Sequence, residues 1–153
     1  HALGQSLAII EYLEETHPEP PLIPKDALAR ARVRQIAYAI ACDIHPVNNL
    51  RVLQHLKREF GATDEQRTDW QKHWIALGFS AIEAILAQSS ETGVYCHGDG
   101  PTLADICLIP QMANARRVNL DFTHYPTLVR LEQTALAHPA FAAAQPMEQP
   151  DAE

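Results

Sequence analysis

The fold is decided by residues 102–117, which read TLADICLIPQMANARR. Thr102 and Asp105 stand three residues apart at the start of this stretch, which is the spacing of a capping box that begins a helix. The residues that follow are apolar on nearly every side of a helix, and this predicts a buried, central position. Pro110 inside the helix predicts a kink. We therefore expect the rest of the chain to pack around this helix.

Helical patterns continue along the rest of the chain, with almost no strand signal. Apolar residues return at three- and four-residue intervals, while prolines, glycines and capping residues mark the ends. Ser6 is expected to cap the first helix. The other helices are expected at about 6–17, 26–42, 46–60, 64–88, 127–136 and 139–144. These patterns predict an all-α bundle.

Composition and charge exclude several classes of protein. The chain has 153 residues, which is one domain or one domain plus a fragment of another, and it begins with His1, which we interpret as a cut end. The net charge of −7 argues against nonspecific binding to nucleic acid or anionic lipid. No apolar run reaches the roughly 18 residues that span a membrane. Cys42, Cys96 and Cys107 are widely spaced and odd in number, as expected for free thiols in the cytoplasm.

Few side chains are spaced for chemistry. The eight histidines do not pair at helical spacing and no Cys-x-x-Cys occurs, so no metal site is expected. Residues 43–51 place a histidine, two amides and an arginine around a helix break, where they could converge on an anion or could form an ordinary capped corner. Arg116 and Arg117 are neighbours about 100° apart on a helix, so at most one of them faces inward. The alternative is a surface pair at a helix C-terminus.

Several strings resemble the zeta class of glutathione transferases, the maleylacetoacetate isomerase family. Residues 5–13, QSLAIIEYL, are similar to the glutamine–serine helix start that closes the glutathione site in thioredoxin-like transferase domains. The box at 102–105 resembles the one shared by the helical domains of these enzymes. The class is indicated by strings at 43–53, 73–75, 78–79, 114–117 and 149–152.

The resemblance implies a fold and its division. The fold would be all-α, the C-terminal helical bundle of the glutathione transferase fold, preceded by the last helix of the thioredoxin-like domain. Residues 1–17 would be a remnant of that glutathione-binding domain, 18–25 the linker and 26–153 the helical domain. The family's Ser-Ser-Cys segment, which activates glutathione, would lie before His1. The chain is therefore expected to be an incomplete form that is inactive alone.

The resemblance also implies an activity for the intact protein, the glutathione-dependent cis–trans isomerisation of maleylacetoacetate in tyrosine breakdown. The glutathione thiolate would add to the cis double bond, which allows rotation before elimination. Isomerisation of maleylpyruvate is one alternative, and a noncatalytic helical module of the same fold is another. The implied substrate is a small dianionic keto acid, and the implied state is a cytoplasmic homodimer.

Site residues follow from the same resemblance. The glutathione site is implied at Gln5, Ser6, His45, Asn49, Leu50 and Arg51. The first two would hold the γ-glutamyl carboxylate, and the others would lie near the opposite end of the tripeptide. Arg117 would hold a carboxylate of the substrate, with His45 in support.

Overall fold

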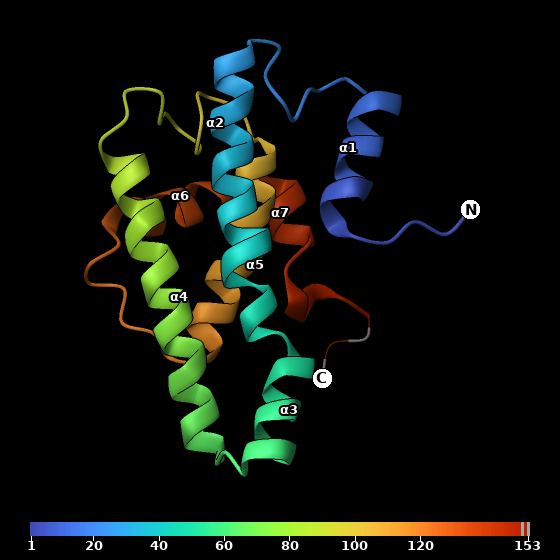
Figure 1. Ribbon diagram of the computed structural model, residues 1–153. Helices are drawn as coiled ribbons and strands as arrows, with labels where there is room; N and C mark the ends of the chain where they lie inside the picture. Colours follow the sequence, from blue (N-terminus) through green and yellow to red (C-terminus); the bar gives the residue numbers. More distant parts are fainter. Residues whose placement is uncertain (151, 153) are drawn as a thin grey trace.

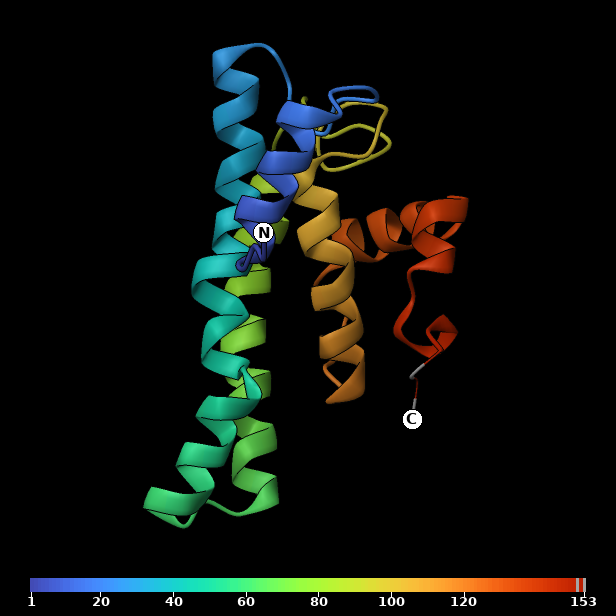
Figure 2. The ribbon, with the colours of Figure 1, turned by 90° about the vertical axis from the view of Figure 1, so that its right-hand side faces the viewer.

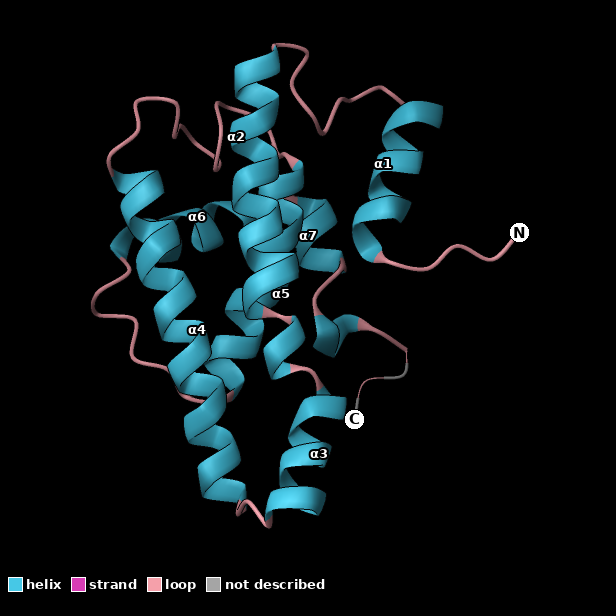
Figure 3. Ribbon diagram, in the orientation of Figure 1, coloured by secondary structure: helices cyan, strands magenta, loops and turns pink. Residues whose placement is uncertain are grey.

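The computed structural model describes residues 1–150 and 152, and within them every regular element is helical (Figures 1 and 3). The α-helices are α1 (Ser6–Thr16), α2 (Ala27–Tyr38), α3 (Leu50–Phe60), α4 (Asp64–Ala87), α5 (Leu103–Arg117), α6 (Pro126–Leu136) and α7 (Pro139–Ala143). Shorter turns follow at Ala39–Ile44, which is π-helical, and at Pro46–Asn48 and Pro146–Glu148, which are 3₁₀.

Helix α5 lies at the centre of the bundle, as predicted, with α2 and α4 on one side and α6 on the other (Figure 2). Eight of its fifteen residues are buried. The capping box is present, because the Asp105 carboxylate accepts the backbone N–H and the hydroxyl of Thr102, both at 2.8 Å. The same carboxylate accepts the N–H of Cys96 at 2.8 Å, which ties the preceding loop to the helix. The helix then continues through Pro110 to Arg117.

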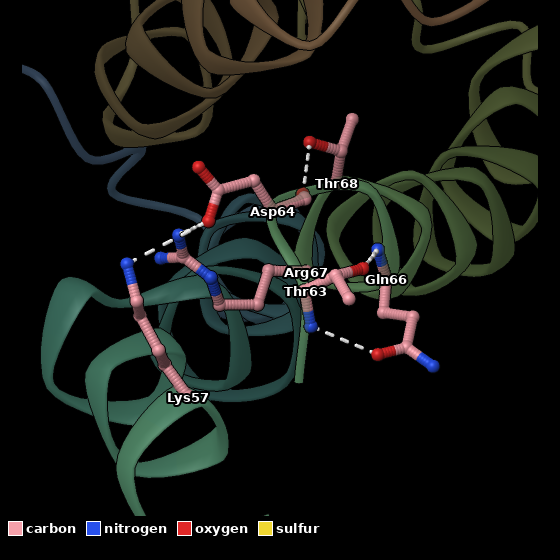
Figure 4. A network of polar contacts seen from close by, with 6 residues as sticks. All are labelled: Lys57, Thr63, Asp64, Gln66, Arg67 and Thr68. Carbon is pink, nitrogen blue, oxygen red and sulfur yellow. Dashed lines mark hydrogen bonds and ion pairs between the residues drawn. The ribbon is translucent and has the colours of Figure 1, made fainter. Parts of the chain in front are cut away.

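A second capping box begins α4, the longest helix (Figure 4). The Thr63 hydroxyl accepts the N–H of Gln66 at 3.2 Å, and the Gln66 side chain accepts the N–H of Thr63 at 2.8 Å. Before it, α3 ends at Gly61, whose φ of 65° is left-handed and favours glycine. Both features confirm the sequence prediction, and they fix the hairpin of α3 and α4.

Helix α1 packs against the same core as the other helices. Leu7 and Ile10 contact the main hydrophobic cluster, although none of its residues is fully buried. The Glu11 carboxylate lies 3.0 Å from the guanidinium of Arg34 on α2. The helix begins differently from the prediction, because Ser6 is the first helical residue and Gln5 is the N-cap, with no side-chain capping bond.

The fold prediction set α1 apart as a helix left over from another domain, in front of a C-terminal bundle. That description needs correction, because α1 shares the hydrophobic core and is joined to α2 by an ion pair. It is also anchored to the following segment, where the Glu14 carboxylate accepts the backbone N–H groups of Leu22 and Ile23 at 2.8 and 3.3 Å. The described helices therefore form one packed unit that includes α1.

Candidate functional site

A pocket of about 140 Å³ lies where the corner between α2 and α3 meets α4 and α5. Its lining residues are two that can carry positive charge, four with carboxamide side chains and two that are apolar. They are His45, Asn48, Asn49, Leu50, Gln71, Ile75, Asn114 and Arg117. No Asp or Glu is found among the described residues that line it. The pocket therefore suits a small anion that also accepts hydrogen bonds.

A larger hollow of about 280 Å³ lies between α1 and α2, but its charge does not suit an anion. Three glutamates and three basic residues line it, and some of these groups already bind one another. Glu11 pairs with Arg34, and Arg30 donates to the backbone carbonyl of Lys25 at 2.8 Å. The smaller pocket, which combines basic groups with carboxamide side chains and has no carboxylate among its described lining residues, is the better candidate site.

The corner that carries His45 is held by backbone and side-chain hydrogen bonds. The N–H of His45 donates to the carbonyl of Ile40 at 2.9 Å, a five-residue step that marks a π turn. Asn48 donates from Nδ2 to the carbonyl of Ile44 at 3.0 Å. Asn49 caps α3, because its side chain accepts the N–H of Arg51 at 3.1 Å. These bonds hold the corner, whose residues line the pocket together with residues of α4 and α5.

Helix α4 approaches this corner unusually closely, and Gly78 makes the approach possible. A Cβ atom at Gly78 would lie 2.3 Å from both Cγ1 and Cδ1 of Ile44, which is far inside van der Waals contact. Nearer the pocket, Trp70 donates from Nε1 to the carbonyl of Val47 at 2.9 Å. Helix α4 thus holds the corner at two points, one on each side of His45.

The end of α5 separates its two arginines. Arg116 turns toward α6, where it forms an ion pair with buried Glu132, with Nε 2.9 and 3.1 Å from the two carboxylate oxygens. Its Cζ lies 4.5 Å from the centroid of the Phe122 ring. The hydrogen bond to Glu132 raises the pKa of Arg116. Arg117 instead lines the pocket together with Asn114, three residues earlier on the same face. The prediction that at most one arginine faces inward is confirmed.

The structure brings together four of the seven site residues predicted from the sequence. His45, Asn49, Leu50 and Arg117 line the pocket. Arg51 follows them on α3 but does not line it. Gln5 and Ser6 lie at the start of α1, away from the pocket, and Gln5 has a φ of 70°, a left-handed conformation that is uncommon for a residue other than glycine.

Four pocket residues were not among the predicted ones. Asn48 and Asn114 stood inside the strings that carried the resemblance, so those strings contained more of the site than was assigned to them. Gln71 and Ile75 lie one helical turn apart on α4. Ile75 belongs to the buried stripe of α4, and Gln71 stands four residues before it. Helical spacing therefore places Gln71 on the same face as Ile75, so the sequence does indicate its position.

The thiols of Cys96 and Cys107 are poor nucleophiles. Burial raises the pKa of Cys107 to about 11, with a smaller effect from nearby Cys42. Burial likewise raises the pKa of Cys96 far above its ordinary value. Both thiols are therefore protonated at neutral pH, and neither can act as a thiolate.

Two features are absent from the described part of the chain. No helix there is long and apolar enough to cross a membrane. No group of three or more His, Cys, Asp or Glu residues there is arranged to hold a metal ion.

Comparison with known proteins gives strong matches, although no protein-family model matches the chain. A probable maleylacetoacetate isomerase of Vibrio cholerae serotype O1 is 49% identical over 150 residues, which cover 98% of this chain and 69% of that protein. The holo structure of a maleylpyruvate isomerase, described as a bacterial zeta-class glutathione S-transferase, superposes with a TM-score of 0.97 at 46% identity. That match covers 99% of this chain and 71% of the other.

A third match has ligands bound. A maleylacetoacetate isomerase from Methylobacterium extorquens AM1, with malonate and glutathione, superposes with a TM-score of 0.95 at 38% identity, covering 99% of this chain and 71% of the other. Both structural matches run through α1 as well as the helices after it. They overturn the fold prediction of a C-terminal bundle with one foreign helix in front, because the chain superposes along 99% of its length as a single unit.

Proposed function

This chain belongs to the family of maleylacetoacetate and maleylpyruvate isomerases, the zeta class of glutathione transferases. On that basis we propose that its protein is an enzyme that isomerises a small dianionic keto acid from cis to trans, with glutathione as cofactor. The observation that carries the proposal is the pocket between α4, α5 and the corner that precedes α3. It presents Arg117 and His45 without an opposing carboxylate among its described lining residues.

Arg117 is the proposed anchor for a carboxylate of the substrate. It is exposed at the pocket and forms no ion pair with a described residue, so its guanidinium is available for a bidentate contact. His45 lines the same pocket from the corner before α3 and would support the second negative charge. A chain with a net charge of −7 needs such local cations to hold a dianion.

We propose that glutathione binds at the start of α1. No side chain caps this helix, so its first-turn N–H groups are free to bind the γ-glutamyl carboxylate. Gln5 and Ser6 are the residues that would hold it, and the left-handed backbone at Gln5 is the kind of strain that is found at ligand sites. Asn49, Leu50 and Arg51 would lie near the other end of the tripeptide. When bound, glutathione supplies the thiolate that adds reversibly to the double bond.

Maleylacetoacetate, an intermediate of tyrosine breakdown, is the proposed substrate, and the similarity to a maleylpyruvate isomerase structure keeps maleylpyruvate as the second candidate. We further propose that the protein is a cytoplasmic homodimer. The division of the chain at residues 18–25, between a glutathione-binding part and the helical domain from 26, stays a prediction.

The test compares Arg117→Ala with Arg58→Ala, which removes an exposed arginine of α3 outside the pocket. Losing a charge-assisted carboxylate contact costs about 2–5 kcal/mol. Arg117→Ala should therefore lower the affinity for malonate, and kcat/KM of the natural gene product for maleylacetoacetate, by about 30-fold or more. The affinity of the Arg117→Ala variant for glutathione should change little. The Arg58→Ala variant should bind malonate about as well as the unchanged protein. If the two variants bind malonate equally well, Arg117 is not the anchor and the proposed site is wrong.

A further inference from the structure

Gln71 occupies an unexpected position on α4. The buried residues of this helix are Ile75, Phe79, Ile82 and Leu86, which form an apolar stripe toward the core. One turn before Ile75 the stripe reaches Gln71, a half-buried residue with a polar side chain. The stripe changes from apolar to polar at the place where the pocket opens.

Two of the other three pocket amides use one of their polar atoms within the protein, whereas Asn114, on α5, forms no side-chain hydrogen bond with a described residue. Asn48 donates to the carbonyl of Ile44 at 3.0 Å, and Asn49 accepts the N–H of Arg51 at 3.1 Å to cap α3. Within the described part of the chain, the Gln71 side chain forms no hydrogen bond. A polar side chain in that position is not explained by the packing of the protein, and it is free to bind a ligand.

The chemistry of Gln71 is suited to an uncharged oxygen. Arg117 and His45 match the carboxylates of a dianion, but the substrate class also carries ketone oxygens, which accept hydrogen bonds without charge. A carboxamide donates two N–H bonds, so Gln71 can hydrogen-bond a ketone oxygen while Arg117 and His45 hold the carboxylates. A site built to hydrogen-bond one group discriminates against analogues that lack it.

We propose that Gln71 donates a hydrogen bond from Nε2 to a ketone oxygen of the substrate, and thereby selects keto dicarboxylates over dicarboxylates without a ketone. This inference rests on the proposed function, because it assumes that Arg117 holds a carboxylate in the same pocket. Helix α4 would then recognise the ketone, whereas Arg117 and His45 would bind only the carboxylates.

The test uses two probes of equal chain length that differ only in a ketone, glutarate and freshly prepared 3-oxoglutarate. Their affinities are measured by calorimetry at saturating glutathione for the unchanged protein, Gln71→Leu and Gln54→Leu. The last variant is the matched control, since Gln54 is exposed on α3 and does not line the pocket. A neutral hydrogen bond is worth about 3- to 10-fold in affinity.

The unchanged protein and Gln54→Leu should prefer 3-oxoglutarate by that factor. Gln71→Leu should lose the preference while its affinity for glutarate stays the same, a result that general damage to the fold would not produce. If Gln71→Leu keeps the preference, or the unchanged protein has none, the inference is wrong. If Arg117→Ala also leaves the affinity for glutarate unchanged, the proposed function is wrong as well. If Arg117→Ala lowers that affinity, only the role of Gln71 is refuted.

Discussion

Gly78→Ala should destabilise the protein, although glycine-to-alanine changes inside a helix normally stabilise it. The normal gain in helix propensity is about 1 kcal/mol. Here the new Cβ would lie 2.3 Å from Cγ1 and Cδ1 of Ile44, which is only 2% exposed and cannot move outward without disturbing the corner that carries His45. Overpacking of this kind costs about 1–3 kcal/mol. The balance of these two effects is a net loss of up to about 2 kcal/mol in the free energy of unfolding.

A double-mutant cycle identifies the cause. Ile44→Ala alone should cost about 2–5 kcal/mol, because it leaves a cavity beneath α4. Combined with Gly78→Ala, the cost should fall short of the sum by about 1–3 kcal/mol, since the new methyl group fills part of that cavity. Urea denaturation followed by far-UV circular dichroism measures all four proteins, and equal m-values show that the unfolding transition stays comparable. A stabilised Gly78→Ala variant, or strictly additive costs, would refute the proposed close contact.

Three further results are expected. Asp105→Ala should lower the free energy of unfolding by about 3 kcal/mol in urea, because it leaves two backbone N–H groups and the hydroxyl of Thr102 without their acceptor; a loss below 1 kcal/mol would contradict this. Arg116→Ala should cost about 2 kcal/mol in the same assay, a buried-pair penalty reduced for the half-exposed arginine, and should leave malonate affinity unchanged. Burial raises the pKa of Cys107 from 9.0 to about 11, so this protonated thiol stabilises the fold below pH 9 and its contribution is lost as pH rises toward 11. Cys107→Ala should reduce the fall in stability over that range, measured by denaturation at each pH.

Features made within a few residues were predictable from the sequence. Both capping boxes, at Thr63 and Thr102, depend on hydrogen bonds that span three residues, so their spacing is visible in the chain. The π turn at Ala39–Ile44 was predicted as the end of an ordinary helix. Helix α4, more than twenty residues later, contacts this turn through Gly78 and the 3₁₀ turn after it through Trp70. A pattern of neighbouring residues cannot predict a contact between segments so far apart in the sequence.

The residues of the candidate site likewise include some that were predicted from local patterns and some that were not. His45 and Arg117 were found because each belongs to a recognisable string, and the separation of Arg117 from its neighbour follows from helix geometry. Gln71 was missed because a polar residue near the start of a helix is usually solvated. Its proposed role depends on the pocket, which α4 and α5 form together with the corner before α3. The placement of α1 was also missed, because its ion pair with Arg34 joins segments that only the folded chain brings together.

The number of residues in the π turn between α2 and α3 sets the direction in which His45 leaves the backbone. An α-helix advances about 100° per residue, so one residue more or less rotates everything beyond it by that angle. A chain that lacked a single residue between Ala39 and Ile44 could complete an ordinary helix with the same buried face on α2. It would nevertheless turn His45 about a quarter of the way around the axis, out of the pocket. The orientation of this histidine thus depends on a count of backbone units, and side-chain substitutions within the turn are a less severe change than a deletion.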